Sequence, residues 1–155
     1  MRILNLKERP EYIEPIAELL FRQWGHLRPG STLESAIKRI ETRCAGTTIP
    51  SAFVAEINSQ PVGTVSIVEY DMDTRKDISP WVSSLFVWET FRHQNIGRKL
   101  VRFIESYAKD IGEERIYLFT PDKQKMYSFL GWKHLEETEY QSRNVSIMVI
   151  NLDVR

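Results

Sequence analysis

One strongly apolar stretch, Trp81 to Val87, constrains the fold of this chain more than any other feature. Its density of tryptophan, valine, leucine and phenylalanine favours a β-strand that is buried on both faces. A short polar turn follows, and apolar residues then recur at helical spacing up to a stop at Gly112: Ile96, Leu100, Val101, Ile104, Tyr107, Ala108 and Ile111. A buried strand leading directly into an amphipathic helix predicts a sheet with helices packed on its faces.

The rest of the chain alternates strand and helix patterns in close succession. Further strands are expected at residues 3–6, 52–57, 62–68, 115–119, 135–140 and 145–152. Further helices are expected at residues 13–24, from residue 33 onward, and from Pro121 to about Leu130 before Gly131. The predicted order is β-α-α-β-β-β-α-β-α-β-β, within a single domain over residues 1–155.

Composition excludes several classes of protein. The chain has 155 residues with 21 basic and 21 acidic side chains, so its net charge of zero argues against nucleic acid as a partner. No apolar run approaches the roughly 20 residues of a membrane span, and the N-terminus lacks a signal-peptide pattern, so a cytoplasmic protein is expected. A single cysteine, Cys44, and no cysteine or histidine pair at ligand spacing predict that no metal is bound.

The turn between the buried strand and its helix is typical of a phosphate site. The first N–H groups of a helix lack partners and carry partial positive charge, which favours binding of a pyrophosphate. Gly97 lets the backbone approach a ligand closely, and Asn95 tolerates a left-handed conformation. Arg92 and Arg98 add charged donors for phosphate oxygens.

Here the sequence resembles the GNAT family of N-acetyltransferases. The family's cofactor motif, Arg/Gln-x-x-Gly-x-Gly/Ala, is matched by Arg92-His93-Gln94-Asn95-Ile96-Gly97, with Asn95 in place of the first glycine. The preceding Leu85-Phe86-Val87 matches the upstream Leu-x-Val pattern. A later Tyr-x-x-x-Gly-Phe ending is matched by Tyr127 to Trp132, and the resemblance covers nearly the whole chain.

The resemblance implies an α/β fold of the acyl-CoA N-acyltransferase type. Its sheet is mixed and mostly antiparallel, with about seven strands, a splayed parallel pair and about four flanking helices. Acetyl-CoA, the implied co-substrate, would place its pantetheine arm in the splay. The residues expected to bind it are Leu85, Phe86, Val87, Arg92, His93, Gln94, Asn95, Ile96, Gly97 and Arg98.

Two residues are predicted to take part in catalysis. Tyr127 matches the family position whose hydroxyl protonates the departing thiolate, and a phenol remains protonated at neutral pH. Glu69, at the end of a strand, is a candidate general base. Asp71, Asp73 and Glu89 are its rivals, and some family members show no evident base.

The acceptor pocket is expected near the connection of the first two helices. Trp24 and His26 lie there, and Trp81 and Ser83 lie on the strand leading to the cofactor, so these four are predicted to contact substrate. The implied function is transfer of the acetyl group of acetyl-CoA to a primary amine of a small molecule or peptide by direct attack in a ternary complex. A non-catalytic acyl-CoA sensor, and an acyltransferase for hydroxyls or longer chains, remain alternatives. The acceptor is not identified, and monomer and homodimer are both compatible with the sequence.

Overall fold

The computed structural model describes residues 1–153, and its strands form one seven-stranded sheet in the order β1-β2-β3-β4-β5-β7-β6. The strands are β1 (Arg2–Asn5), β2 (Ser51–Ile57), β3 (Gln60–Val68), β4 (Trp81–Val87), β5 (Arg115–Thr120), β6 (Lys133–Tyr140) and β7 (Arg143–Asn151). All neighbouring strands are antiparallel except β4 and β5, which are parallel. The predicted mixed, mostly antiparallel sheet is confirmed.

The helices are α1 (Ile13–Trp24), α2 (Leu33–Cys44), α3 (Ile96–Asp110) and α4 (Gln124–Phe129). They follow the predicted order of elements along the chain. One boundary was wrong, because α4 begins at Gln124 rather than at Pro121. Thr120 Oγ1 accepts the backbone N–H of Lys123 at 3.0 Å, which holds the residues between them in a turn.

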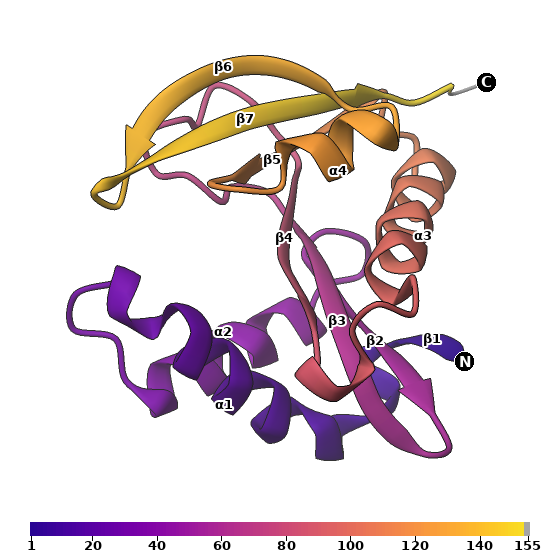
Figure 1. Ribbon diagram of the computed structural model, residues 1–155. Coiled ribbons are helices and arrows are strands. Elements are labelled where there is room, and N and C mark those ends of the chain that lie inside the picture. Colours follow the sequence, from indigo (N-terminus) through magenta and orange to yellow (C-terminus); the bar gives the residue numbers. More distant parts are fainter. Residues whose placement is uncertain (154–155) are drawn as a thin grey trace.

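The two faces of β2 bury different helices, as the alternation of side chains along a strand requires. Phe53 and Ala55 pack in a core with α3, whereas Ala52 and Val54 pack in a second core with α1 and α2. Figure 1 shows α1 and α2 on one side of this part of the sheet and α3 on the other. In the described part of the chain, no helix has both the length and the apolar character of a membrane span.

Glu56 on β2 ties the N-terminal segment to the sheet. Its buried carboxylate accepts hydrogen bonds from Arg2 Nη2 (3.0 Å), Arg9 Nε (3.1 Å) and Tyr12 Oη (2.7 Å). The Tyr12 hydroxyl, followed by the Arg2 guanidinium, lowers the pKa of Glu56 to about 2. The ionised form of Glu56 therefore stabilises the folded chain.

This lowered pKa predicts a loss of stability in acid. An acid with a depressed folded-state pKa contributes stability that is fully present above its ordinary value of 4.5 and disappears as the pH falls toward 2. The urea midpoint should therefore fall between about pH 6 and about pH 3. Glu56→Gln should lower the midpoint at pH 6 and reduce its dependence on pH, whereas an unchanged dependence would contradict the assignment.

Candidate functional site

The parallel strands β4 and β5 separate almost as soon as they meet. Their register consists of the single pair Trp81 and Tyr117, and the N–H of Tyr117 donates to the carbonyl of Pro80 at 3.0 Å. Beyond this point a cleft of about 910 Å³ opens, lined by residues 82–87 of β4, the turn before α3, the end of β5 and part of α4. One edge of β4 thus faces a cleft large enough for an extended ligand.

A β-bulge shapes the cleft side of β4. The register with β3 shifts between Thr64 and Ser66, and Ser84 adopts a left-handed conformation with φ of 56°. Arg43, a buried residue of α2, donates through Nη1 to Ser66 Oγ (3.1 Å) and Ser84 Oγ (2.9 Å). Arg43 therefore joins α2 to the bulge in β4.

The turn before α3 leaves helix donors unpaired at the cleft. Asn95 is the N-cap residue and adopts a left-handed conformation with φ of 63°, which agrees with the prediction that it tolerates this conformation. Its side chain makes no capping hydrogen bond to the described residues. The helix begins at Ile96, and its first intrahelical bond to the cap runs from the N–H of Lys99 to the carbonyl of Asn95 (3.0 Å). The first N–H groups of α3 are consequently available to an anion.

Gly97 leaves open space above these donors. A Cβ added at Gly97 would meet only Val87 Cγ2, at an ordinary contact distance of 3.7 Å. Gly97 also lines the cleft. The protein's own packing therefore does not require glycine here, whereas close approach of a ligand to the backbone does.

Two arginines flank this turn. Arg92 Nε donates to the carbonyl of Val87 at 3.1 Å, and its guanidinium lies 5.4 Å from the centre of the Phe86 ring. Arg98 lies 5.2 Å from the centre of the Phe129 ring. Both arginines are exposed and line the cleft, where they can donate to phosphate oxygens.

The cleft contains most of the predicted cofactor residues. Those that line it are Leu85, Phe86, Val87, Arg92, His93, Asn95, Ile96, Gly97 and Arg98. Gln94 is exposed on the turn and does not line the cleft.

Tyr127 brings a buried phenol to the cleft from α4. Its ring packs edge-on against Trp132, with ring centres 5.9 Å apart. Burial, assisted by the nearby Asp122, raises the pKa of Tyr127, so its hydroxyl stays protonated at neutral pH. Within residues 1–153 this hydroxyl has no hydrogen-bond partner, which leaves its proton free for a group in the cleft.

The four candidate bases are placed differently. Glu69, Asp73 and Glu89 are exposed and do not line the cleft. Asp71, in the connection between β3 and β4, lines the cleft and accepts a hydrogen bond from Ser83 Oγ at 2.8 Å. Burial raises the pKa of Asp71, and Arg43 opposes that shift.

Of the four residues predicted to contact the acceptor substrate, two line the cleft and two do not. Trp24 and Ser83 line the cleft, and Trp24 meets Phe86 edge-on with ring centres 5.8 Å apart. His26 is exposed and outside the lining set. Trp81 is fully buried, and its indole N–H donates to the carbonyl of Ile78 at 2.9 Å, so its side chain faces the interior.

Four further arginines at the cleft were not predicted from the sequence, namely Arg28, Arg39, Arg43 and Arg143. A signal for one of them was present. Ala36 and Ile40 form the buried stripe of α2, and Arg43 continues that stripe at helical spacing. A charged residue on a buried stripe points to a polar partner inside the protein.

In residues 1–153, no group of three or more histidine, cysteine or acidic side chains is arranged to hold a metal ion.

The family model described as "Acetyltransferase (GNAT) family" matches residues 13–132 of this sequence. A comparison with curated proteins finds no sequence that matches.

Solved structures share this fold. Aminoglycoside 6'-acetyltransferase type Ii superposes with a TM-score of 0.78 at 19% identity, covering 100% of this chain and 99% of that one. An aminoglycoside 6'-N-acetyltransferase complexed with coenzyme A gives 0.78 at 16% identity, covering 100% and 99%. The yncA protein of Salmonella typhimurium, solved with its cofactor acetyl-CoA, gives 0.77 at 14% identity, covering 99% and 95%. At these identities the likeness establishes the fold.

Proposed function

This chain belongs to the acetyltransferase (GNAT) family, and from that premise we propose that it transfers the acetyl group of acetyl-CoA to a primary amine. The acceptor is a small molecule or a peptide, and the amine attacks the thioester directly while both substrates are bound. Two structural neighbours were solved with coenzyme A or with acetyl-CoA bound, which supports this co-substrate.

The observation that carries the proposal is the juxtaposition of two unpaired backbone surfaces at one cleft. Among residues 1–153, the edge of β4 beyond Trp81 has no strand partner on the β5 side. The first N–H groups of α3 lie beside Gly97 at the same cleft. The first surface can pair with the amide groups of a pantetheine arm, and the second can bind a pyrophosphate. Arg92 and Arg98 supply further charge at the phosphate end.

Within this arrangement Tyr127 and Asp71 have complementary properties. The bound thioester supplies a thiolate leaving group. The Tyr127 hydroxyl, kept protonated by burial, can donate its proton to that sulfur. The Asp71 carboxylate lines the same cleft and can accept the proton that the amine loses, directly or through water. We therefore assign the base to Asp71 in preference to Glu69, which is exposed to solvent.

Amine-dependent release of CoA tests the proposed function. The chain is incubated with acetyl-CoA and a panel of primary amines, free thiol is followed over time, and products are identified by mass spectrometry. An acetylated amine formed together with free CoA supports transfer. Tight binding of acetyl-CoA with no transfer to any amine would instead favour the sensor alternative.

Asp71→Asn should lower kcat/KM by about 100-fold or more if Asp71 is the base. Because burial raises its pKa, Asp71 can accept a proton only above that raised value. The wild-type pH profile should therefore show an acidic limb above the ordinary aspartate range, and the variant should lose it. Glu69→Gln is the matched control and should retain wild-type rates. A large fall in kcat/KM for Glu69→Gln, with little change for Asp71→Asn, would instead identify Glu69 as the general base.

A further inference from the structure

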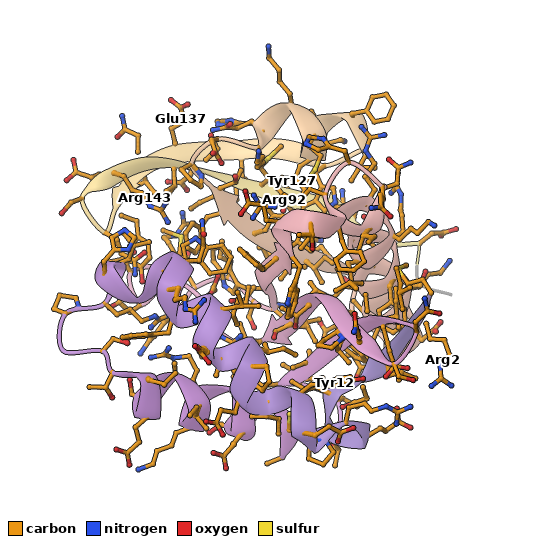
Figure 2. All side chains as sticks on the ribbon, turned by 60° about the horizontal axis from the view of Figure 1, so that its bottom comes forward. Arg2, Tyr12, Arg92, Tyr127, Glu137 and Arg143 are labelled. Atoms are coloured by element: carbon orange, nitrogen blue, oxygen red, sulfur yellow. The ribbon has the colours of Figure 1, made fainter. Side chains whose placement is uncertain are left out.

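The cleft carries a concentration of arginine away from the α3 turn. Arg28 follows α1, Arg39 and Arg43 lie on α2, and Arg143 begins β7, and all four line the cleft. Figure 1 shows the connection between α1 and α2 and the turn between β6 and β7 on the same side of the molecule. Figure 2 shows Arg143 well apart from Arg92 and Tyr127.

One acidic residue accompanies these four cations. Asp71 interacts electrostatically with Arg28, Arg39 and Arg43. The other acidic residue lining the cleft, Asp122, lies on the connection between β5 and α4, beside Lys123. Among the residues that line this end of the cleft, four arginines accompany one carboxylate, so positive charge is in excess even with Asp71 ionised.

Asp71 is near three of these guanidinium groups but forms a direct ion pair with none of them among residues 1–153. In the part of the chain that the structure describes, none of the four arginines forms a salt bridge. Arg43 donates to serine hydroxyls, and Asp71 is hydrogen-bonded to Ser83. Arg143 Nε is buried and has no hydrogen-bond partner among the described residues, which is uncommon for a buried donor.

The clustering is energetically unfavourable in the absence of an anion. Burial, reinforced by the neighbouring Arg28, lowers the pKa of Arg39. Burial also lowers the pKa of Arg43 to about 10, although Asp71 opposes that shift. Cations that are desolvated and held together gain from an anion that binds between them. An acceptor with several ammonium groups would add like charge to the same place.

We propose that the acceptor amine also carries an oxyanion, a carboxylate or a phosphate, which the arginines at this end of the cleft bind. This inference rests on the proposed acetyl transfer, because it assigns this end of the cleft to the acceptor. Guanidinium groups suit both anions, since their planar donors match the oxygens of either. Arg39 and Arg143 are the groups on which the test depends, because Arg43 also supports the bulge in β4.

Binding of matched amine pairs to the chain saturated with CoA tests the proposal without requiring turnover. One pair is an α-amino acid and its amide, a second is an aminoalkyl phosphate and the corresponding amino alcohol, and an aminoglycoside represents multiply charged amines. Several amino acids are used for the first pair. Titration calorimetry gives each Kd, and the same compounds are then tested for acetylation with acetyl-CoA.

The anionic member of at least one pair should bind about 10- to 100-fold more tightly than its neutral partner. Arg39→Gln and Arg143→Gln should each remove most of that preference and leave acetyl-CoA binding unchanged. Lys38→Gln, at an exposed neighbouring position of α2, is the matched control and should retain the preference. Comparison of the two pairs distinguishes a carboxylate from a phosphate.

Equal binding within both pairs, tighter binding of the aminoglycoside, or no binding of any anionic amine would overturn the inference. Acetylation of neutral or multiply charged amines alone would also overturn it and leave the proposed transfer intact. Anionic amines that bind through Arg39 and Arg143 without being acetylated, while other amines are acetylated, would mean that the arginines bind an anion other than the acceptor, which also overturns the inference. If no amine of any kind is acetylated, the proposed transfer itself is contradicted.

Discussion

Gly97→Trp is expected to weaken acetyl-CoA binding by at least about 100-fold, or about 2.7 kcal/mol. An indole at this position would fill the space above the first N–H groups of α3, where a pyrophosphate is expected to bind. Hydrogen bonds to charged groups contribute about 1.5–3 kcal/mol each, so the loss of two of them accounts for this effect. Titration calorimetry of the wild type and the variant measures it directly.

The fold should tolerate the same substitution. The nearest atom to a Cβ at Gly97 is 3.7 Å away, and tryptophan has a higher helix propensity than glycine. Lys99→Trp is the matched control, because Lys99 is exposed in the same turn of α3 and lies outside the cleft lining. It should bind acetyl-CoA as the wild type does. Equal binding by the wild type and a folded Gly97→Trp variant would show that the phosphate site lies elsewhere.

Tyr127→Phe is expected to lower kcat by about 100-fold, with little change in the Kd for acetyl-CoA. The substitution keeps the ring that packs against Trp132 and removes only the proton donor. Because that hydroxyl has no partner within residues 1–153, the free energy of unfolding should change little. Pre-steady-state and steady-state rates of CoA release measure the effect once an acceptor is known.

The size of the change in kcat distinguishes two mechanisms. A fall of this size, with unchanged binding, identifies Tyr127 as the donor to the leaving sulfur. A change of less than about 3-fold would mean that the thiolate leaves without this proton and that Tyr127 serves packing alone. The raised pKa of Tyr127 predicts that wild-type kcat has no loss from tyrosine ionisation near its ordinary value of 10.

The sequence was most informative where a local pattern determines local structure. The apolar strand β4, the left-handed Asn95 and the amphipathic α3 follow from apolar periodicity and backbone preferences, and the structure confirms each of them. The parallel pairing of β4 and β5 is not contained in either segment. It was predicted because the segments 92–97 and 127–132 match motifs of a family whose fold is known.

Residues positioned by tertiary packing were harder to predict. Ser84 enters the cleft through a bulge in β4. Trp81, which was predicted to contact substrate from its place on this strand, instead faces the interior. Glu69 and Asp71 are two residues apart, yet the connection between β3 and β4 exposes one and brings the other to the cleft. The conformation of this loop determines which of the two side chains reaches the cleft, and an irregular loop has no apolar periodicity from which that could be predicted.

The net charge of the chain gave no indication of the arginines that gather at one end of the cleft. Basic and acidic residues number 21 each, and this balance was used only to argue against nucleic acid as a partner. The fold nevertheless gathers Arg28, Arg39, Arg43 and Arg143 around one cleft, from three separate segments of the chain. A net charge of zero therefore does not exclude a strongly cationic site.

Titration of acetyl-CoA into the wild-type chain tests the central claim most directly, because every assignment in the cleft depends on that substrate. The account predicts saturable binding at one site per chain, weakened by Gly97→Trp and unaffected by Lys99→Trp. Absence of binding, in a sample whose cooperative unfolding shows that it is folded, would contradict the account.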